Sequence, residues 1–299
     1  MRGDIHMSPP DVRVDHVSVA VRDIDTALTF FRRCLPIDMR VQKRPGYTDD
    51  FNWCDFYVGQ FKLELIEGTR PASFVRRFID TRGEGLHHLS LKVADLEPLL
   101  ARLEADGLRI VDRFTGSEGQ LTAFISPRSA NGVLIQFWQV PRMEEPERPR
   151  VVPFRLRSGE TIRLYVDHVS MAVRSIDATL AFYRRCFAIE GGDNKHPGYD
   201  GRFFLTSFLV NGYKLELIEE APGGAAGFVS RFLARRGEGF HHISIDVDRL
   251  DPLIAQLEAD GVRIVDKVDI GGGWKTAFIS PRSAHGVLIQ FWQDPSLVA

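Results

Sequence analysis

The chain has 299 residues, of which 44% are hydrophobic and 26% are charged, and its formal net charge is −2. This length suffices for two domains with separate cores, and no apolar run approaches the roughly 18 residues of a membrane span, so we expect a cytoplasmic protein without a membrane partner. A nearly neutral chain with dispersed Lys and Arg lacks the basic field that nucleic-acid binding requires, which favours a small-molecule substrate.

The first 140 residues predict two copies of a strand–helix–three-strand unit. An alternating strand (DHVSVAV, 15–21) precedes an amphipathic helix, and three strands follow around 39–43, 53–58 and 61–66. An additional helix (FVRRFIDTRGEG, 74–85) leads to the second copy. There, the strand HHLSLKV precedes a helix that ends at Asp106-Gly107, and strands follow around 109–113, 121–125 and 133–139.

The second half of the chain repeats the first. TAFISPRSANGVLIQ at 122–136 returns at 276–290 with one difference, and DHVSVAVRDID returns as DHVSMAVRSID. We therefore predict one domain at 12–140, a Pro-, Arg- and Glu-rich linker at 141–163, and a second domain at 164–294. The expected fold class is α+β, with four βαβββ modules that form curved mixed sheets.

Polar residues inside apolar strands fall in register with this repeat. His16 and His88 are 72 residues apart, as are Glu64 and Gln136, and the second half repeats the set as His168, Glu216, His242 and Gln290. A lone histidine in a strand is ordinarily a core or surface residue, but a buried polar group needs a partner, and this constellation occurs twice.

Strand alternation places His16 on the face opposite the valines that pack under the helix. If the sheets of two modules face each other, two imidazoles, a carboxylate and an amide converge on one point. This ligand set suits Mn, Fe, Co, Ni or Zn, so we expect two divalent cations per chain. Alternation directs His87 and His241 to the opposite face, where they would have a supporting or structural role.

These same segments resemble a known family. GEGLHHLSLKV, KLELIE and SPRSANGVLIQFWQ are similar to the vicinal-oxygen-chelate superfamily of glyoxalase I, methylmalonyl-CoA epimerase, extradiol dioxygenases and bleomycin-resistance proteins. The likeness is greatest to methylmalonyl-CoA epimerase and covers both halves. It implies that the four positions in register are the metal ligands of each half. In the epimerases and glyoxalases the last of these ligands is usually a glutamate that also transfers a proton, whereas this chain has Gln136 and Gln290, whose amides cannot accept a proton at neutral pH.

The catalytic role therefore passes to Glu64 and Glu216 in our hypothesis, which is a metal-dependent epimerase or isomerase. The cation would chelate two neighbouring oxygens of a hydroxy-ketone, such as a cyclitol-like compound, or of an acyl thioester, and stabilise the enolate. A lyase of the glyoxalase type would use the same site. The alternatives are a non-haem Fe(II) ring-cleaving dioxygenase, which also uses two histidines and a carboxylate, and a resistance protein that sequesters a small molecule without catalysis.

Three pairs of residues are candidates for substrate contacts. They are Tyr47 and Tyr199 in the PGY turns, Arg128 and Arg282 in the SPRSA loops, and Trp138 and Trp292 two residues beyond the glutamines. Surface tyrosines, structural arginines and core tryptophans are the alternatives. The third strands, FNWCDFYVG and FFLTSFLVN, differ strongly, so the two halves could differ in substrate or activity. A homodimer is left open.

Overall fold

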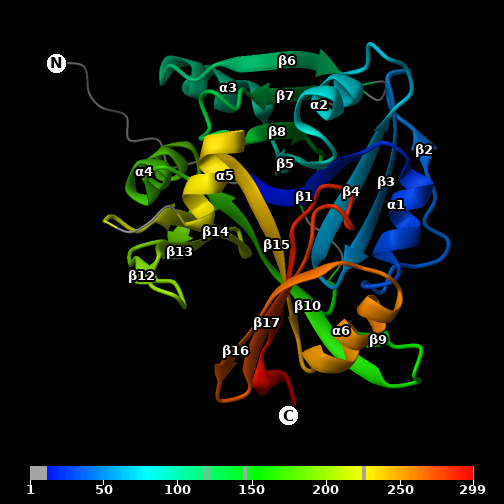
Figure 1. The fold of residues 1–299 in the computed structure, drawn as a ribbon. Helices are drawn as coiled ribbons and strands as arrows, with labels where there is room; N and C mark the ends of the chain where they lie inside the picture. The colour runs from blue at the N-terminus through cyan, green and yellow to red at the C-terminus, as the bar shows by residue number, and fades with distance from the viewer. Residues whose placement is uncertain (1–11, 117–118, 120, 144–146, 224–226, 299) are drawn as a thin grey trace.

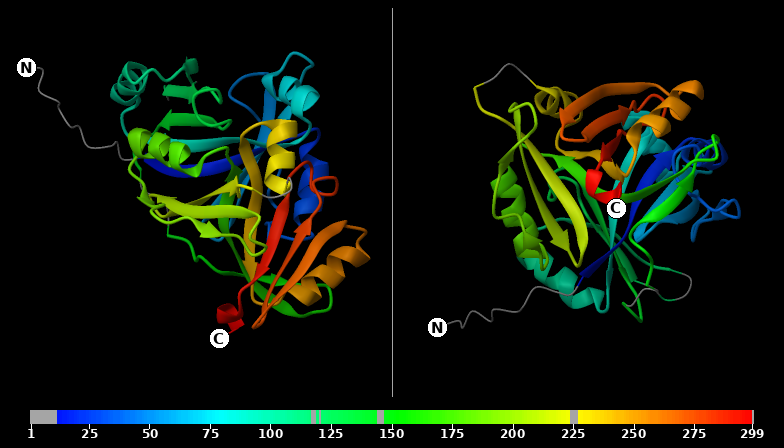
Figure 2. Two further views of the ribbon diagram at one scale, coloured as in Figure 1. Left: turned by 60° about the vertical axis from the view of Figure 1, so that its left-hand side comes forward. Right: turned by 90° about the horizontal axis from the view of Figure 1, so that it is seen from below.

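The computed structural model describes residues 12–116, 119, 121–143, 147–223 and 227–298. These residues form two mixed sheets with six α-helices (Figure 1). Figure 2 shows the strands of the first half, in blue to blue-green, and those of the second half, in green to red, as strongly curved sheets. The predicted α+β class with four βαβββ modules is confirmed. Among the described residues, no helix combines the length and the apolar character that crossing a membrane requires.

The first sheet has eight strands in the order β2-β3-β4-β1-β5-β8-β7-β6. Parallel pairing joins β1 to β4 and β5 to β8, while β1 and β5 run antiparallel, so the two modules form one continuous sheet. The elements of this half are β1 (Val12–Val21), α1 (Ile24–Phe31), β2 (Arg44–Pro45), β3 (Phe51–Val58), β4 (Phe61–Gly68), α2 (Phe74–Arg82), β5 (Gly85–Val93), α3 (Leu96–Ala105), β6 (Ile110–Thr115), β7 (Leu121–Ile125) and β8 (Leu134–Gln139).

The second sheet repeats this order as β11-β13-β14-β10-β15-β18-β17-β16, with β12 paired to β13 and β9 to β10. Its elements are β9 (Val152–Arg155), β10 (Thr161–Ala172), α4 (Ile176–Cys186), β11 (Glu190–Gly191), β12 (His196–Pro197), β13 (Phe203–Val210), β14 (Tyr213–Glu220), α5 (Phe228–Arg236), β15 (Gly239–Val247), α6 (Leu250–Ala259), β16 (Ile264–Gly271), β17 (Trp274–Ile279), β18 (Ile289–Gln293) and the 3₁₀-helix η1 (Pro295–Val298).

Two details differ from the sequence-based expectation. The strand expected at 39–43 does not form, because the Arg32 guanidinium binds the carbonyls of Asp38, Met39 and Val41, which a strand partner would otherwise use. In the segment 141–163, residues of β9 pair with the beginning of β10, so the second sheet starts before the proposed domain boundary at 164.

One apolar core joins the two halves. It contains side chains from α1, α3, α4 and α6 and from both sheets. The ring of Phe137 lies 5.8 Å from that of Phe187, and Arg102 on α3 donates a 2.6 Å hydrogen bond to the Cys186 carbonyl on α4. Figure 1 shows α3 and α4 side by side. We infer that the halves are fixed relative to each other.

Two loops make matching contacts across the junction. A Cβ atom at Gly132 would collide with the Glu238 carbonyl, and one at Gly286 would collide with the Glu84 carbonyl. Reciprocal hydrogen bonds of 3.4 and 3.3 Å run from each of Arg82 and Arg236 to the carbonyl of the other. The junction therefore has approximate twofold symmetry and closely approaching backbones.

Substitution of Gly132 tests this junction. Gly107→Ala is the matched control, because Gly107 has a φ of +79° against +80° for Gly132 but has no atom near an added Cβ. We expect Gly107→Ala to lower the free energy of unfolding by about 1–2 kcal/mol through backbone strain alone. Gly132→Ala should cost an additional ~1–3 kcal/mol because it also forces the halves apart. Chemical denaturation measures both values, and equal losses would contradict the packed junction.

Candidate metal centres

The four predicted ligands of the first half lie on four neighbouring strands. Glu64 lies on β4, His16 on β1, His88 on β5 and Gln136 on β8, and these strands are consecutive in one sheet. The pairing register places Ser18 opposite Glu64 and His88, and Ser90 opposite His16 and Gln136. The side chains thus meet on one face of a single curved sheet, not between two facing sheets, and all four come from one half.

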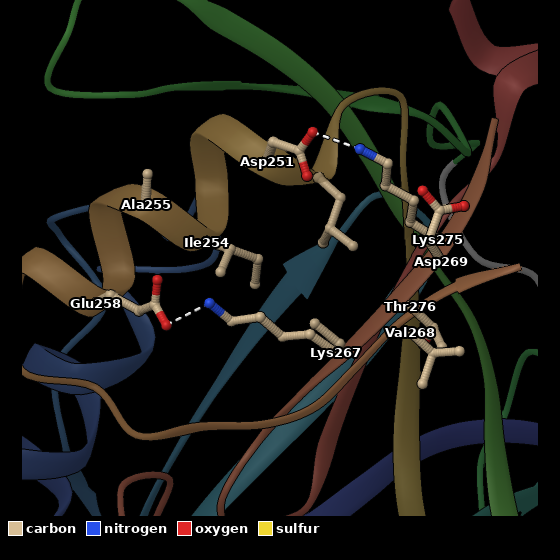
Figure 3. A pocket seen from close by; sticks show the side chains of 11 residues that line it. Asp251, Ile254, Ala255, Glu258, Lys267, Val268, Asp269, Lys275 and Thr276 are labelled. Atoms are coloured by element: carbon tan, nitrogen blue, oxygen red, sulfur yellow. Dashed lines mark hydrogen bonds and ion pairs between the residues drawn. The ribbon is translucent and has the colours of Figure 1, made fainter. Parts of the chain in front are cut away.

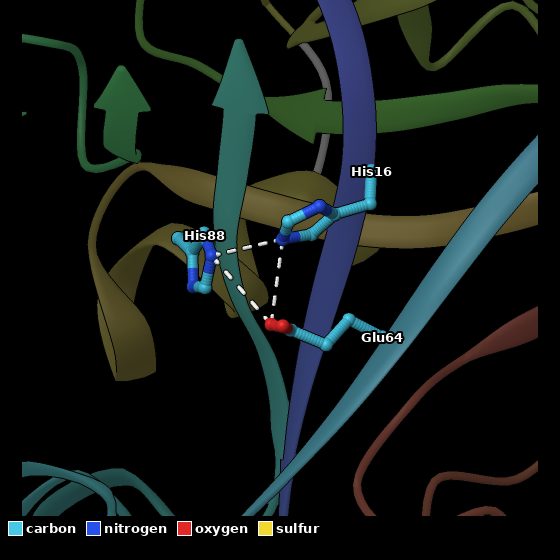
Figure 4. A group of neighbouring side chains, drawn as sticks. All are labelled: His16, Glu64 and His88. Carbon is cyan, nitrogen blue, oxygen red and sulfur yellow. Dashed lines mark hydrogen bonds and ion pairs between the residues drawn. The ribbon is translucent and has the colours of Figure 1, made fainter. Parts of the chain in front are cut away.

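The side-chain atoms of the first centre point toward one another (Figure 4). The Nε2 atom of His16 lies 3.3 Å from Nε2 of His88 and 3.4 Å from Oε2 of Glu64, and His88 Nε2 lies 3.8 Å from that same oxygen. Two ligands that each lie about 2.1 Å from a cation, at an angle between 90° and 110°, are about 3.0–3.4 Å apart. The observed triangle is therefore close to the size that a shared cation imposes. The side chain of Gln136, the fourth predicted ligand, lies beside His88.

The second centre has the same arrangement. Oε1 of Glu216 lies 3.4 Å from Nε2 of His168 and 4.0 Å from Nε2 of His242. Gln290 lies beside His242, and its amide nitrogen donates to the Thr276 hydroxyl at 3.1 Å. Because Thr276 holds the amide nitrogen, the amide oxygen is the atom available to a cation.

The donors of both centres fit a divalent cation. Within the described residues, the Nε2 atoms of His168 and His242 are buried and have no hydrogen-bond partner. Their nearest acceptor is the Glu216 carboxylate, at 3.4 and 4.0 Å, and a cation between these atoms would satisfy both nitrogens and the carboxylate. Two imidazole nitrogens, a carboxylate oxygen and an amide oxygen suit the borderline metals Mn, Fe, Co, Ni and Zn.

Two aspartates that the sequence reasoning missed orient the first histidine of each centre. Asp15 Oδ2 lies 2.6 Å from Nδ1 of His16, and Asp167 Oδ2 lies 2.8 Å from Nδ1 of His168. Carboxylates in this position fix the ring orientation of metal-binding histidines. The signal was the Asp-His pair that begins the repeated DHVS motif in both halves.

His87 and His241 do not face away from the centres as alternation predicted. The register of β1 and β5 shifts so that Ser18 opposes His88 and Val19 opposes Leu86, which leaves His87 as the additional residue of a β-bulge. Its Nδ1 lies 2.9 Å from Nδ1 of His88, and its ring packs 4.7 Å from Phe78 of α2. The same shift and the same 2.9 Å contact occur between His241 and His242.

The charge states of the metal-free centres follow from burial and from the close carboxylates. Burial lowers the pKa of His16, but Glu64 and Asp15 outweigh it and raise this pKa to about 9. Burial also opposes ionisation of Glu64, but His16 lowers its pKa to about 2. The pKa values are again about 9 for His168 and about 2 for Glu216, for the same reasons. Burial holds the pKa of His88 and His242 well below the usual value, so these imidazoles are neutral ligands.

A cavity of about 410 Å³ opens on the second centre. Its walls include all four predicted ligands of this half and two of the predicted substrate residues, Tyr199 and Trp292. In the first half, Tyr47 stacks on Phe114, and Trp138 lies 5.6 Å below the Lys92 ammonium group.

The loops that carry Arg128 and Arg282 lie elsewhere. They contain Gly132 and Gly286, which pack against the opposite half, and Arg282 is not part of the cavity wall. The structure thus brings the eight predicted ligands into two groups, and it places the loop arginines near the junction.

A separate hollow of about 350 Å³ lies between α6 and the strands β16 and β17 (Figure 3). Ion pairs from Lys275 to Asp251 and from Lys267 to Glu258 cross it. It contains none of the predicted ligands.

The chain has two matches to the family model described as Glyoxalase/Bleomycin resistance protein/Dioxygenase superfamily, at residues 15–124 and 167–278. The chain belongs to this superfamily. The protein YqjC of Bacillus subtilis, described as uncharacterized, is 36% identical over 126 residues, which are 42% of this chain and 89% of that protein. The mitochondrial methylmalonyl-CoA epimerase of Dictyostelium discoideum is 29% identical over 130 residues, which are 42% of this chain and 75% of the relative.

One solved structure superposes on nearly the whole chain. A mutant of 4-hydroxymandelate synthase from Streptomyces coelicolor matches with a TM-score of 0.61 and 18% identity, and the match covers 96% of this chain and 93% of the other. The similarity shows that the paired arrangement of both halves, and not only each half, is a known fold.

Metal affinity should depend on pH. A cation must displace the proton from His16 or His168, whose pKa values in the metal-free protein are about 9. Below pH 9 these imidazoles are protonated, so we expect the Mn²⁺ association constant of each centre to rise with pH, by up to about tenfold per unit, and to level off above 9. Calorimetric titration between pH 6 and 8 measures this slope, and a constant affinity over that range would contradict the assignment.

Removal of the Asp15 carboxylate should weaken binding at the first centre. In a His242→Ala chain, which keeps one intact centre, we expect Asp15→Asn to lower the Co²⁺ affinity by about 10- to 100-fold, because His16 loses its orienting partner. Competition with a chromophoric chelator measures the change. Asp38→Asn, at an exposed carboxylate, is the control and should leave the affinity unchanged. Equal Co²⁺ affinities of the Asp15→Asn and Asp38→Asn variants would contradict a role of Asp15 in metal binding.

Proposed function

We propose that this protein is a divalent-metal-dependent epimerase or isomerase of a small molecule with two neighbouring oxygens. The observation that carries the proposal is the repeated triangle of two histidines and a glutamate, with a carboxylate oxygen 3.4 Å from a histidine nitrogen in each half. In the second half this triangle borders a cavity large enough for a small substrate. The similarity to methylmalonyl-CoA epimerase over a single half supports the reaction class.

The proposed ligands are His16, Glu64, His88 and Gln136 in the first half and His168, Glu216, His242 and Gln290 in the second, which gives two cations per chain. A divalent cation at such a site supplies Lewis acidity toward substrate oxygens. The histidines hold it in place, and Asp15 and Asp167 keep His16 and His168 oriented.

The proton-transfer role belongs to Glu64 and Glu216 in this proposal. In the metal-free centre burial raises the pKa of each carboxyl group, but the adjacent histidine outweighs burial and lowers the value to about 2. Each group is therefore a carboxylate at neutral pH, and its oxygen lone pairs can accept a proton. The amides of Gln136 and Gln290 cannot do so. The carboxylate takes the proton from the carbon next to the substrate carbonyl. Solvent supplies a proton to the opposite face of that carbon, which inverts its configuration, and the glutamate releases its proton to solvent.

The substrate in this proposal is a hydroxy-ketone, which includes cyclitol-like compounds, or an acyl thioester. A ring-cleaving oxygenase would use the same three side chains with Fe(II). The two reactions have different signatures, since epimerisation exchanges a carbon-bound proton with solvent and consumes no oxygen.

Solvent exchange tests the proposal directly. Chain loaded with Co²⁺ or Mn²⁺ in D₂O should incorporate deuterium next to the carbonyl of 2-hydroxycyclohexanone or of methylmalonyl-CoA, as followed by NMR. Joint replacement Glu64→Gln and Glu216→Gln should lower the rate by about 10²- to 10⁴-fold, because both bases are lost.

The control for this experiment is Glu97→Gln, which replaces an exposed carboxylate on α3 and should exchange at the normal rate. Full exchange by the double variant would remove the two glutamates from the mechanism. Fe(II)-dependent oxygen consumption without exchange would support the oxygenase instead.

A further inference from the structure

The two centres share their ligands but have different walls. Tyr199 and Phe278 line the cavity of the second half, and their counterparts in the repeat are Tyr47 and Phe124. In the first half, the ring of Phe114 stacks 5.1 Å from Tyr47 and lies 6.4 Å from Phe124. Phe114 therefore occupies the space between the two side chains whose counterparts are cavity walls in the second half.

The counterpart of Phe114 is Val268, and the pairing register confirms this equivalence. Phe114 lies opposite Thr122 in the first sheet, and Val268 lies opposite Thr276 in the second. A valine side chain has no ring that could stack on Tyr199. The stacked pair of Tyr47 and Phe114, which we call the roof of the first centre, therefore has no equivalent in the second half.

A second bulky side chain, Trp53, stabilises the segment that covers the first centre. Leu205 lines the second cavity, whereas its counterpart in the first half is Trp53. The Trp53 indole donates a 3.1 Å hydrogen bond to the Pro45 carbonyl, and the Arg44 guanidinium lies 4.2 Å from its ring. These contacts hold the segment that carries Tyr47 close to the sheet.

The second cavity is acidic. Four carboxyl groups line it, from Asp167, Glu216, Asp246 and Asp294, together with one ammonium group, from Lys214, which pairs with Asp167 at 2.6 Å. Asp246 replaces Lys92 of the first half, and its partner is the Tyr165 hydroxyl, which donates to it at 2.8 Å. Away from the cation, the carboxyl groups of Asp246 and Asp294 disfavour phosphate and carboxylate groups and accept hydrogen bonds from hydroxyl groups.

The mouth of this cavity is rimmed by exposed apolar side chains. Trp274 is 39% exposed, and its ring lies 6.1 Å from that of Trp292. Tyr199 is 48% exposed, as is its counterpart Tyr47 at 49%. Exposed aromatic side chains beside a cavity mark a binding surface for an apolar face. The cavity therefore presents flat aromatic surfaces at its mouth and carboxylate hydrogen-bond acceptors in its wall.

We propose that the second half is the one that takes the substrate, and that this substrate is an uncharged, hydroxyl-bearing ring compound whose face packs on Trp274 and Trp292 and whose hydroxyl binds Asp246. The first centre, roofed by Tyr47 and Phe114, holds its cation without turning over substrate. This inference rests on the proposed function, since it names the half and the substrate class of that reaction.

Exchange of residues between the halves tests this division. Val268→Phe copies the first-half residue into the second half and should lower kcat/KM for deuterium exchange into 2-hydroxycyclohexanone at least tenfold, while two Co²⁺ ions per chain remain bound. Phe114→Val, the reciprocal change, is the matched control and should not lower the rate, because it leaves the second cavity intact. Glu216→Gln alone should lose as much activity as the double glutamate variant.

Two further measurements complete the test. Asp246→Asn should raise KM for 2-hydroxycyclohexanone several-fold with little change in kcat, and methylmalonyl-CoA should exchange far more slowly than the neutral ketone. A normal rate in Val268→Phe, half of the activity in Glu216→Gln, or preferred exchange of methylmalonyl-CoA would each overturn this inference while the epimerase proposal stands.

A binding measurement tests this inference even if neither probe compound is turned over. Absence of turnover would contradict the proposed function and not the assignment of the cavity. Addition of 2-hydroxycyclohexanone to the Co²⁺-loaded chain should change the tryptophan fluorescence, and Val268→Phe should abolish the change. No change in the natural chain, or an equal change in Val268→Phe, would overturn the assignment of the second cavity.

Discussion

The burial of two imidazoles and a carboxylate around one point is the constraint on which the rest of this structure depends. Each group would cost about 1–3 kcal/mol if it were buried without a partner. In the second half, two of the nitrogens have no hydrogen-bond partner in the described part of the chain. A divalent cation would satisfy the imidazole nitrogens and the carboxylate oxygen at once. The duplicated chain keeps this arrangement in both halves, although the surrounding walls have diverged.

The fold meets this constraint by placing the four ligand-bearing strands next to one another. In the first half, β1 and β5 are antiparallel to each other, and each pairs in parallel with an outer strand, which gives a symmetric set of four strands under the centre. A β-bulge lets the consecutive residues His87 and His88 both lie near this centre. Rigidity comes from the common core and from the close contacts at Gly132 and Gly286. Ligands on strands of a packed sheet are held more precisely than ligands on loops.

Much of this arrangement could be predicted from the sequence. The internal repeat predicted the four βαβββ modules. Polar residues within apolar strands predicted the eight ligand positions that the structure brings together. The bulge at His87 could not be predicted, because one additional residue in a strand leaves no periodic pattern. The prediction of a strand at 39–43 was wrong, because the Arg32 side chain binds backbone carbonyls in this segment. The role of Asp15 and the filling of the first site by Phe114 depend on contacts between distant segments, which alternation does not report.

The central claim is that each half binds one divalent cation between its two histidines, glutamate and glutamine. Anomalous diffraction from crystals grown with Co²⁺ or Mn²⁺ tests it most directly. The account predicts two anomalous peaks per chain, each within about 2.0–2.3 Å of both histidine Nε2 atoms and of a glutamate oxygen. Peaks at other positions, or none at these centres under saturating metal, would contradict it.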